Sequence, residues 1–226
     1  MPLRETEAVV LRTHRLGEAD KIASLLTRQF GRLRAVAGGA QRPRSRYGGT
    51  LEPLSHIRLW LFERENRDLL RINSVELVES FFDMQKDYRV QVAAQYVAEV
   101  SERFLPEREV NDRAFRLLVA VLRALKQSQE VSRPLVYFDY WLLRLGGFLP
   151  EFTRCAACGS ELGAQAFYGP GVEGLLCAAC QGTLERWFAA ERPPAGLREA
   201  RRFFEELIES HLERKLVTRE LLAEEA

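Results

Sequence analysis

The 226-residue sequence predicts an α+β protein in which a small closed β-barrel precedes an all-helical domain that carries a four-cysteine module. Three observations predict this arrangement. Short β-prone runs fill the first 80 residues, a period near 3.6 follows, and all four cysteines lie between positions 155 and 180. We therefore expect a barrel at 1–80 and a helical domain at 81–226, with the cysteine module inserted at 152–182.

Five β-prone segments account for the barrel. Turn residues separate the first three, at Gly17 to Asp20 and at Gly31. In the fourth segment the side chains alternate with a period of two, which is typical of a strand. The segments are Ala8–Leu11, Ile22–Thr27, Arg32–Ala37, Ile57–Phe62 and a last one around Leu69–Leu77. Five strands within such a short stretch fit a small closed barrel.

Helices are expected after residue 80, where the apolar residues follow the helical period. Pro106 ends the first helix. Ser132 is placed to cap the third helix, and Gly146 and Gly147 are placed to end it. The expected ranges are 87–105, 112–128, 132–147, 181–190 and 197–216.

Composition and charge exclude several classes of protein. Apolar residues make up 46% and charged residues 29%, and the net charge is +1, which excludes a wholly disordered chain and a histone-like polycation. The longest apolar runs fall far short of the roughly 20 residues of a spanning helix. The N-terminus has only the apolar run Ala8–Leu11 between charged residues, which is no signal-peptide core. We therefore expect a cytoplasmic protein with no membrane partner.

The cysteines predict a metal site. Two Cys-x-x-Cys pairs are separated by 18 residues, and each pair can bind one tetrahedral ion from a tight turn. A redox-active pair and two disulfides are the alternatives, and a reducing compartment disfavours the disulfides. Four thiolates leave no open coordination position, and Arg154 is the only basic residue in 152–182, so we expect one structural Zn²⁺. The ligands are Cys155, Cys158, Cys177 and Cys180.

An acid-free segment from Lys21 to Leu51 contains seven basic residues. Such a segment indicates a polyanionic partner, with a solvated loop as the alternative. Arginines beside aromatic rings are the combination that single-strand binders use. For Trp60 and Phe62 the alternative is packing on the helical domain. The predicted nucleic-acid-binding residues are Arg32, Arg34, Arg42, Arg44, Arg46, Tyr47, Arg58 and Trp60.

Catalytic machinery is not evident in the sequence. The three histidines, His14, His56 and His211, lie in unrelated segments beside no motif. The GxxxxGK[ST] phosphate loop of nucleotide hydrolases does not occur. We therefore expect a protein that is not an enzyme.

Three segments carry a resemblance that covers essentially the whole chain. They are EAVVLRTHRLGEADKIASLLTRQFGRLRAVAGGAQRPRSRYGGTLEP near the N-terminus, the internal FDYWLLRLGGFLPEFTRCAACG, and HLERKLVTRE near the C-terminus. Together they resemble the bacterial RecO family of DNA-repair and recombination-mediator proteins. The first segment is the most specific, since the glycine, the arginine loop and Leu-Glu-Pro follow in order.

This resemblance implies that the barrel is an OB fold and that the chain is nucleoid-associated. It implies binding of single- and double-stranded DNA, annealing of complementary strands and, with RecR, loading of RecA onto DNA coated by single-strand-binding protein. The predicted helix 112–128 carries Arg113, Arg116 and Arg123 on one side. These arginines are either a solvated edge or, as the resemblance implies, a dock for the acidic tail of single-strand-binding protein.

Two other classes compete with this interpretation. One is a generic OB-fold protein that binds single-stranded DNA without mediator activity. The other is a zinc-ribbon accessory factor of transcription. Neither class predicts a long helical domain around the metal module.

Overall fold

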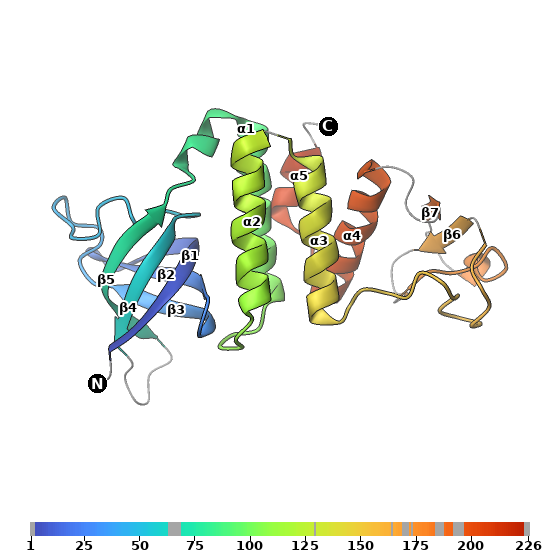
Figure 1. Ribbon diagram of the computed structural model, residues 1–226, viewed down its shortest axis with the longest axis horizontal. Coiled ribbons are helices and arrows are strands. Elements are labelled where there is room, and N and C mark those ends of the chain that lie inside the picture. Colours follow the sequence, from blue (N-terminus) through green and yellow to red (C-terminus); the bar gives the residue numbers. More distant parts are fainter. Residues whose placement is uncertain are drawn as a thin grey trace.

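The computed structural model describes residues 3–62, 69–128, 130–163, 165–168, 172, 174–183, 188–191 and 197–223. The molecule is elongated, with a β-barrel at one end, a bundle of helices in the middle and the cysteine segment at the other end (Figure 1). The last two helices, α4 (Leu197–Leu212) and α5 (Val217–Ala223), return from the cysteine segment to the bundle. The predicted α+β class is confirmed.

Five strands close the barrel, as predicted, and their order is β1-β2-β3-β5-β4. The β3 and β5 strands pair in parallel and the other neighbours pair antiparallel, which gives an OB-type barrel. The first strand is much longer than the predicted run because it serves two neighbours, and a bulge between Val10 and Arg12 bends it. The strands are β1 (Leu3–Leu16), β2 (Asp20–Thr27), β3 (Gly31–Ala37), β4 (His56–Phe62) and β5 (Leu70–Glu79).

Apolar side chains from alternate strand positions fill the barrel interior. In β3 every second residue is buried, and Arg34 between two of them is exposed. Two side chains of segment 38–55, Tyr47 and Leu51, enter the same core, and each is 2% exposed. The segment between β3 and β4 is therefore an integral part of the barrel.

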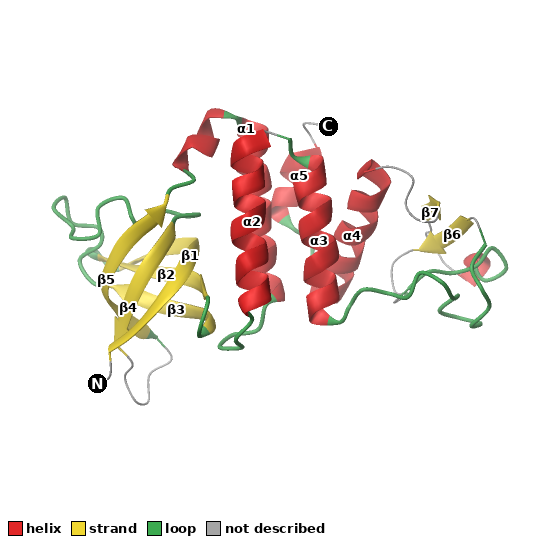
Figure 2. Ribbon diagram, in the orientation of Figure 1, coloured by secondary structure: helices red, strands yellow, loops and turns green. Residues whose placement is uncertain are grey.

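The helical domain follows the predicted order in its first half (Figure 2). The predicted helices 87–105 and 112–128 are confirmed, and the third ends at Gly147, whose φ of 78° is left-handed. None of the described helices is both long and apolar enough to cross a membrane. The elements are the 3₁₀ turn η1 (Phe82–Lys86) and the helices α1 (Tyr88–Phe104), α2 (Asp112–Ser128) and α3 (Ser132–Gly146).

The predicted helix at 181–190 is wrong. A single 3₁₀ turn, η2 (Gln181–Thr183), is followed after undescribed residues by the strand β7 (Phe188–Glu191). This strand pairs antiparallel with β6 (Gln165–Tyr168). A short apolar run has no measurable period, so it does not distinguish a strand from a helix.

Two further details of the helices differ from the prediction. Val131, not Ser132, is the N-cap residue of α3, and the carboxylate of Glu130 accepts the amide of Arg133 at 3.0 Å. The helix predicted at 197–216 ends at Leu212, because the chain turns at Glu213, whose φ is 52°, and the short helix α5 that follows was not predicted.

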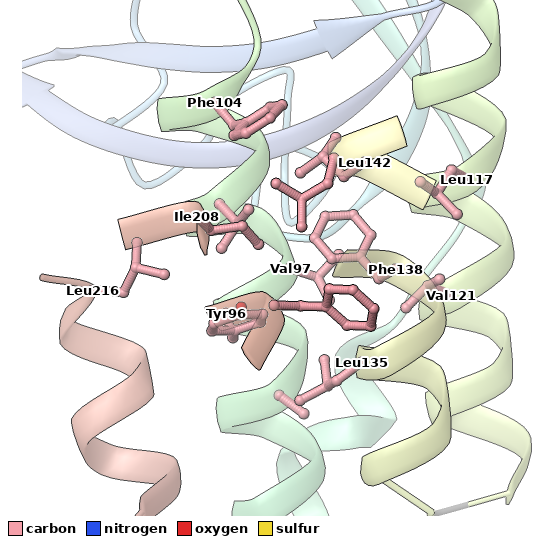
Figure 3. Close-up of a cluster of buried hydrophobic side chains, with 14 of the residues drawn as sticks. Tyr96, Val97, Phe104, Leu117, Val121, Leu135, Phe138, Leu142, Ile208 and Leu216 are labelled. Atoms are coloured by element: carbon pink, nitrogen blue, oxygen red, sulfur yellow. The ribbon is translucent and has the colours of Figure 1, made fainter. Parts of the chain in front are cut away.

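The helical core forms where the helices face one another. Figure 3 shows Phe138 of α3 beside Val97 of α1 and Val121 of α2. Next to it, the hydroxyl of Tyr96 donates to Oδ1 of Asp139 at 3.0 Å, and both residues are fully buried. Burial raises the pKa of Asp139 well above its ordinary value, which favours the neutral acid.

The outer face of β1 and β2 packs on the helices. Val9, Leu11 and Leu26 point away from the barrel interior and belong to the same buried cluster as residues of α1 and α2. Two of the predicted barrel segments therefore contribute to the helical core, so the barrel and the helices share an apolar interface.

Arginines fix the edge of this interface. Arg32 donates from Nε to the carbonyl of Leu105 at 2.8 Å. Arg28 pairs with Asp112 at the start of α2, also at 2.8 Å. Hydrogen bonds that involve a charged group are stronger than neutral ones, so these contacts hold the barrel and the helices in one arrangement.

Gly31 opens β3 where the loop after α1 touches the barrel. Its φ is 68°, and a Cβ built there would lie 2.1 Å from the carbonyl oxygen of Glu109. Gly17, in the β1–β2 turn, has a similar φ of 61° and nothing within 4 Å. Gly17→Ala therefore measures the conformational strain alone, and Gly31→Ala adds a collision with backbone.

We expect Gly17→Ala to lower the free energy of unfolding by about 1 kcal/mol, the usual cost of a left-handed alanine. Gly31→Ala should cost about 3 kcal/mol or more, because the loop must move off the barrel. Urea unfolding of the parent and both variants measures the difference. Equal losses for the two variants would contradict the close approach.

His56 gives the interface a dependence on pH. Its Nε2 lies 3.1 Å from Glu7, and its ring meets Phe115 of α2 edge-on at 5.7 Å. Burial lowers the pKa of His56 from its usual 6.5, with a smaller contribution from Arg123, although Glu7 and Glu79 oppose the shift. The unfolded chain therefore binds this proton more readily than the folded protein.

The resulting stability is fully present above the unfolded pKa of His56 and is lost as the pH falls below it. We expect this residue to add a slope of at most about 1.4 kcal/mol per pH unit to the free energy of unfolding. His56→Gln should flatten the acid limb of a stability–pH profile, whereas His14→Gln at the surface should leave it unchanged. Identical profiles for the parent and His56→Gln would refute the assignment.

Candidate nucleic-acid interface and metal centre

Segment 38–55 folds as successive tight turns against the β1–β2 hairpin. Gly39 donates its amide to Oδ1 of Asp20 at 2.7 Å, and the side-chain amide of Gln41 donates to the Asp20 carbonyl at 2.7 Å. The Gln41 amide donates to the carbonyl of Ala19 at 2.9 Å. The glycines of this segment therefore allow turns that are tied to the barrel at both ends.

Tyr47 anchors the segment from inside. Its hydroxyl donates to the carbonyl of Ile72 at 3.2 Å and accepts from Nη2 of Arg46 at 2.9 Å. The structure places Tyr47, a predicted nucleic-acid-binding residue, in the barrel core, where a ring that is 2% exposed offers no face to a base. Its contribution is to fix the backbone that presents the neighbouring arginines.

Arg42, Arg44 and Arg46 are exposed, as predicted. Within the described part of the chain, neither Arg42 nor Arg44 has an acidic partner. The guanidinium of Arg46 lies 5.0 Å from the centroid of the Tyr47 ring. Because the backbone of this loop is fixed, the three cations can meet a polyanion without first ordering the loop.

A hollow of about 460 Å³ extends this surface onto the β1–β2 hairpin. It brings Arg15 and Lys21 beside the arginine loop, although Lys21 also pairs with Glu52 at 3.3 Å. Arg15 was missed at the sequence level. The turn at Gly17 to Asp20 was a sufficient signal, because a hairpin across it places Arg15 opposite Lys21. We call Arg15, Lys21, Arg42, Arg44 and Arg46 the basic loop surface.

Arg32 and Arg34 share the outer face of β3, but they are not equivalent. Arg32 is 16% exposed and its guanidinium pairs with Glu107 at 3.2 Å, besides its bond to Leu105. Nε and Nη1 of Arg32 are thus engaged by the loop after α1, which disfavours the predicted contact of Arg32 with nucleic acid. Arg34 is 53% exposed and shares the Glu107 carboxylate at 3.4 Å.

Arg58 and Trp60 lie on the outer face of β4, which β5 separates from β3. Glu5 of β1 lies between them: it is 3.6 Å from Arg58 and accepts the indole N–H of Trp60 at 3.2 Å. Among the described residues, Trp60 is not one of those packed on the helical core. The structure does not bring this pair to the basic loop surface, and the carboxylate between them opposes a phosphate.

The three arginines of α2 have different surroundings. Arg116 is 65% exposed and pairs with Asp112 one turn away at 3.1 Å. Arg123 pairs with Glu79 of β5 at 2.8 Å, so it belongs to the interface between the barrel and the helices. Arg113 is exposed. Arg113 and Arg116, the first half of the predicted arginine row, are therefore exposed away from this interface, whereas Arg123 is half exposed at its edge.

The four predicted cysteines come together at the far end of the molecule. Their Sγ atoms all lie within 4.8 Å of one another, and Cys158 and Cys177 are 3.8 Å apart. Four thiolates bonded to one tetrahedral ion at about 2.3 Å would be about 3.8 Å apart. All four thiols are free of disulfides. The cluster therefore fits a metal ion, and it excludes the two disulfides in this arrangement.

Backbone turns aim the sulfurs at one point. The chain turns after the first pair, where Gly159 has a φ of 72° and donates to the carbonyl of Cys155 at 2.9 Å. An antiparallel bridge between Phe167 and Leu176 folds the second pair onto the first. Burial raises the pKa of Cys155, but backbone amides, Cys177 first, outweigh it and lower the pKa to about 6. Amides that stabilise a thiolate also suit a metal ligand.

An OB-type barrel that is docked on a helical domain with a tetrathiolate centre defines a multi-part protein with a metal-binding module. The N-terminal family model of recombination protein O matches residues 1–81, and the C-terminal model matches residues 85–220. The chain therefore belongs to the RecO family of DNA repair proteins.

Individual relatives agree with the family models. The chain is 40% identical to the DNA repair protein RecO of Koribacter versatilis, with 96% of each chain covered. It is 41% identical to the protein of the same description from Nocardioides sp., over 79% of this chain and 75% of the relative. It is 34% identical to the DNA repair protein RecO of Anaeromyxobacter sp. strain K, over 96% of this chain and 94% of the relative.

We expect the purified chain to contain about one Zn²⁺ and to lose stability when a strong chelator removes it, because the metal bonds exist only in the folded state. Cys177→Ser should abolish stoichiometric metal and lower the melting temperature. Elemental analysis and thermal unfolding measure the two effects. Arg154→Ala, at an exposed position next to Cys155, is the control that should keep its metal. Metal-free protein from a chelator-free purification would contradict the site.

Proposed function

We propose that this chain is a recombination mediator that binds single- and double-stranded DNA and anneals complementary strands. With RecR it would help to load RecA onto DNA that is coated by single-strand-binding protein. Membership of the RecO family supports the pathway. The observation that carries DNA binding is the basic loop surface, where Arg42 and Arg44 are exposed and without acidic partners in the described part of the chain.

The chemistry of this surface favours the DNA backbone over the bases. Guanidinium groups bind phosphates, and phosphate contacts carry no sequence information. The exposed rings expected here by sequence are absent from the surface, since Tyr47 is buried and Trp60 lies on another face. Binding at this site is therefore electrostatic and tolerant of sequence. Annealing follows when the charge of two strands is neutralised together.

The proposal assigns separate tasks to the two parts of the chain. The barrel at 1–80 would hold DNA, and the helical domain at 81–226 would offer surfaces to protein partners at the nucleoid. The ion at the cysteines would be Zn²⁺, which when bound supplies a cross-link within 152–182. No catalysis is proposed: His56 is buried in the interface, and the ring of His211 packs against that of Phe148, with centroids 3.6 Å apart and the planes tilted by 39°.

A generic single-strand-binding protein with an OB fold is the alternative, and one experiment separates the two. Complementary strands are first coated with single-strand-binding protein, and annealing is then followed with and without this chain. A mediator accelerates the annealing of the coated strands. A passive coat protein leaves it unchanged or slows it, and that result would refute the proposal.

We expect the affinity for single-stranded DNA to depend on salt through the basic loop surface. Replacing Arg42, Arg44 and Arg46 together by Ala should reduce the slope of log affinity against log salt concentration by about 2, because each phosphate contact contributes about 0.7. The same variant should anneal strands more slowly. Arg32→Ala is the matched control: it should lower the free energy of unfolding by about 1.5–3 kcal/mol and leave the slope unchanged, because its bonds hold the interface.

A salt titration of both variants beside the parent makes the measurement. If the triple variant keeps the slope of the parent, the DNA contacts lie elsewhere.

We expect the exposed half of the α2 arginine row to bind the acidic tail of single-strand-binding protein. Arg116→Glu should weaken binding of a tail peptide about fivefold, since reversal replaces an exposed ion pair by a repulsion. Binding of naked DNA should change little. Lys86→Glu, which is exposed on η1, is the control for the change in net charge. Equal losses of peptide and DNA affinity would identify a DNA surface instead.

A further inference from the structure

A row of aromatic and basic side chains lies on the exposed face of α3. Tyr137 is 53% exposed, and its ring centroid is 6.1 Å from that of the partly buried Trp141. Arg144 lies one turn further, with its guanidinium 5.1 Å from the centroid of the Trp141 ring. Arg133 is exposed one turn before Tyr137. We call these four residues the α3 stripe.

The helical period explains why these side chains share a face. Steps of four, four and three residues keep them in one line along the helix, over about 16 Å. The opposite face of α3 is buried, with Leu135, Phe138 and Leu142 in the helical core (Figure 3). The core therefore fixes the orientation of α3. Arg133, Tyr137 and Arg144 are exposed, and Trp141, which packs against the core on one side, is partly exposed between them.

The charge of the stripe is positive. The single acidic residue within α3, Asp139, is fully buried on the other face. The nearest acidic residue along the chain is Glu130, which accepts the Arg133 amide at 3.0 Å. Two cations thus flank two rings with no carboxylate between them, in contrast to Arg58 and Trp60, which share Glu5.

We propose that the α3 stripe is a second binding site for single-stranded DNA, an inference that rests on the proposed annealing function. Bases stack on the rings of Tyr137 and Trp141, and phosphates bind Arg133 and Arg144. Stacking on aromatic side chains beside arginines is tolerant of sequence, because every base has a flat face. This is the ring-and-arginine combination that the sequence led us to expect on the barrel.

The position of the stripe gives it a use distinct from that of the basic loop surface. The α2 helix lies between α3 and the barrel (Figure 1), so the two surfaces are at least one helix diameter, about 10 Å, apart. One chain can then hold one strand by its phosphates at the barrel and a second strand by its bases at α3. Two strands held on one protein meet as in an intramolecular reaction.

The test counts strands per chain. Two non-complementary oligonucleotides of about eight nucleotides, which do not anneal, carry different fluorophores. The stripe variant is Arg133→Ala with Tyr137→Ala. The matched control is Tyr88→Ala with Arg89→Ala, which removes the same two residue types from the exposed start of α1, where Tyr88 is 51% exposed. Thermal unfolding verifies that both variants fold.

The parent and the control should bind two oligonucleotides per chain and show energy transfer between them. At concentrations where the parent binds two oligonucleotides, the stripe variant should bind one, because the loss of a stacked base weakens binding at the α3 stripe about tenfold. The stripe variant should also anneal complementary strands more slowly. A stripe variant that still binds two oligonucleotides would overturn the inference. So would one that keeps DNA binding and loses only an acidic peptide with an apolar C-terminus. A parent that binds no oligonucleotide would instead refute the proposed function.

Discussion

The docking of the outer face of β1 and β2 on the helices is the contact on which the rest of the structure depends. In OB folds the face of strands 2 and 3 commonly receives oligonucleotides. Here Leu26 on that face is buried in the helical core, and Arg32 beside it is held by the loop after α1. The protein itself thus covers part of the usual binding face, although Arg34 of β3 stays 53% exposed. Surfaces away from the docking, at the barrel loops and on α3, are also open to a polyanion.

The same contact divides one run of arginines into two groups. Arg28 and Arg32 meet Asp112 and Glu107, which lie 84 and 75 residues further along the chain. The arginines of segment 38–55 lie on the other side of the fold and meet no such carboxylates in the described part of the chain. An acid-free stretch of sequence is therefore no measure of free positive charge. How much of its positive charge is free depends on which acidic side chains the tertiary fold brings to the stretch.

This explains which features were predictable from sequence. The strands of the barrel, α2 and the cysteine cluster follow from local periods and spacing, and each was predicted. The burial of Tyr47 was not, because its position among arginines and glycines is that of a surface loop, and only the barrel core explains it. Arg15 was predictable from the turn at Gly17 to Asp20, but a count of charges along the chain does not show that the hairpin places it opposite Lys21. The strand β7 was mistaken for a helix because its partner β6 lies 20 residues away and no local signal marks the pair.

The metal centre and the basic loop surface lie at opposite ends of the molecule (Figure 1). The C-terminal residues 151–226 carry 13 acidic and 9 basic side chains, which disfavours a grip on DNA at that end. The module is instead coupled to the bundle, because Tyr168 of β6 meets Phe203 of α4 with ring centroids 4.6 Å apart. Metal loss should therefore loosen α4, which packs against α3 through Phe204 and Tyr140. By this route an ion bound at the cysteines would support α3, although it lies at the opposite end of the molecule from the basic loop surface.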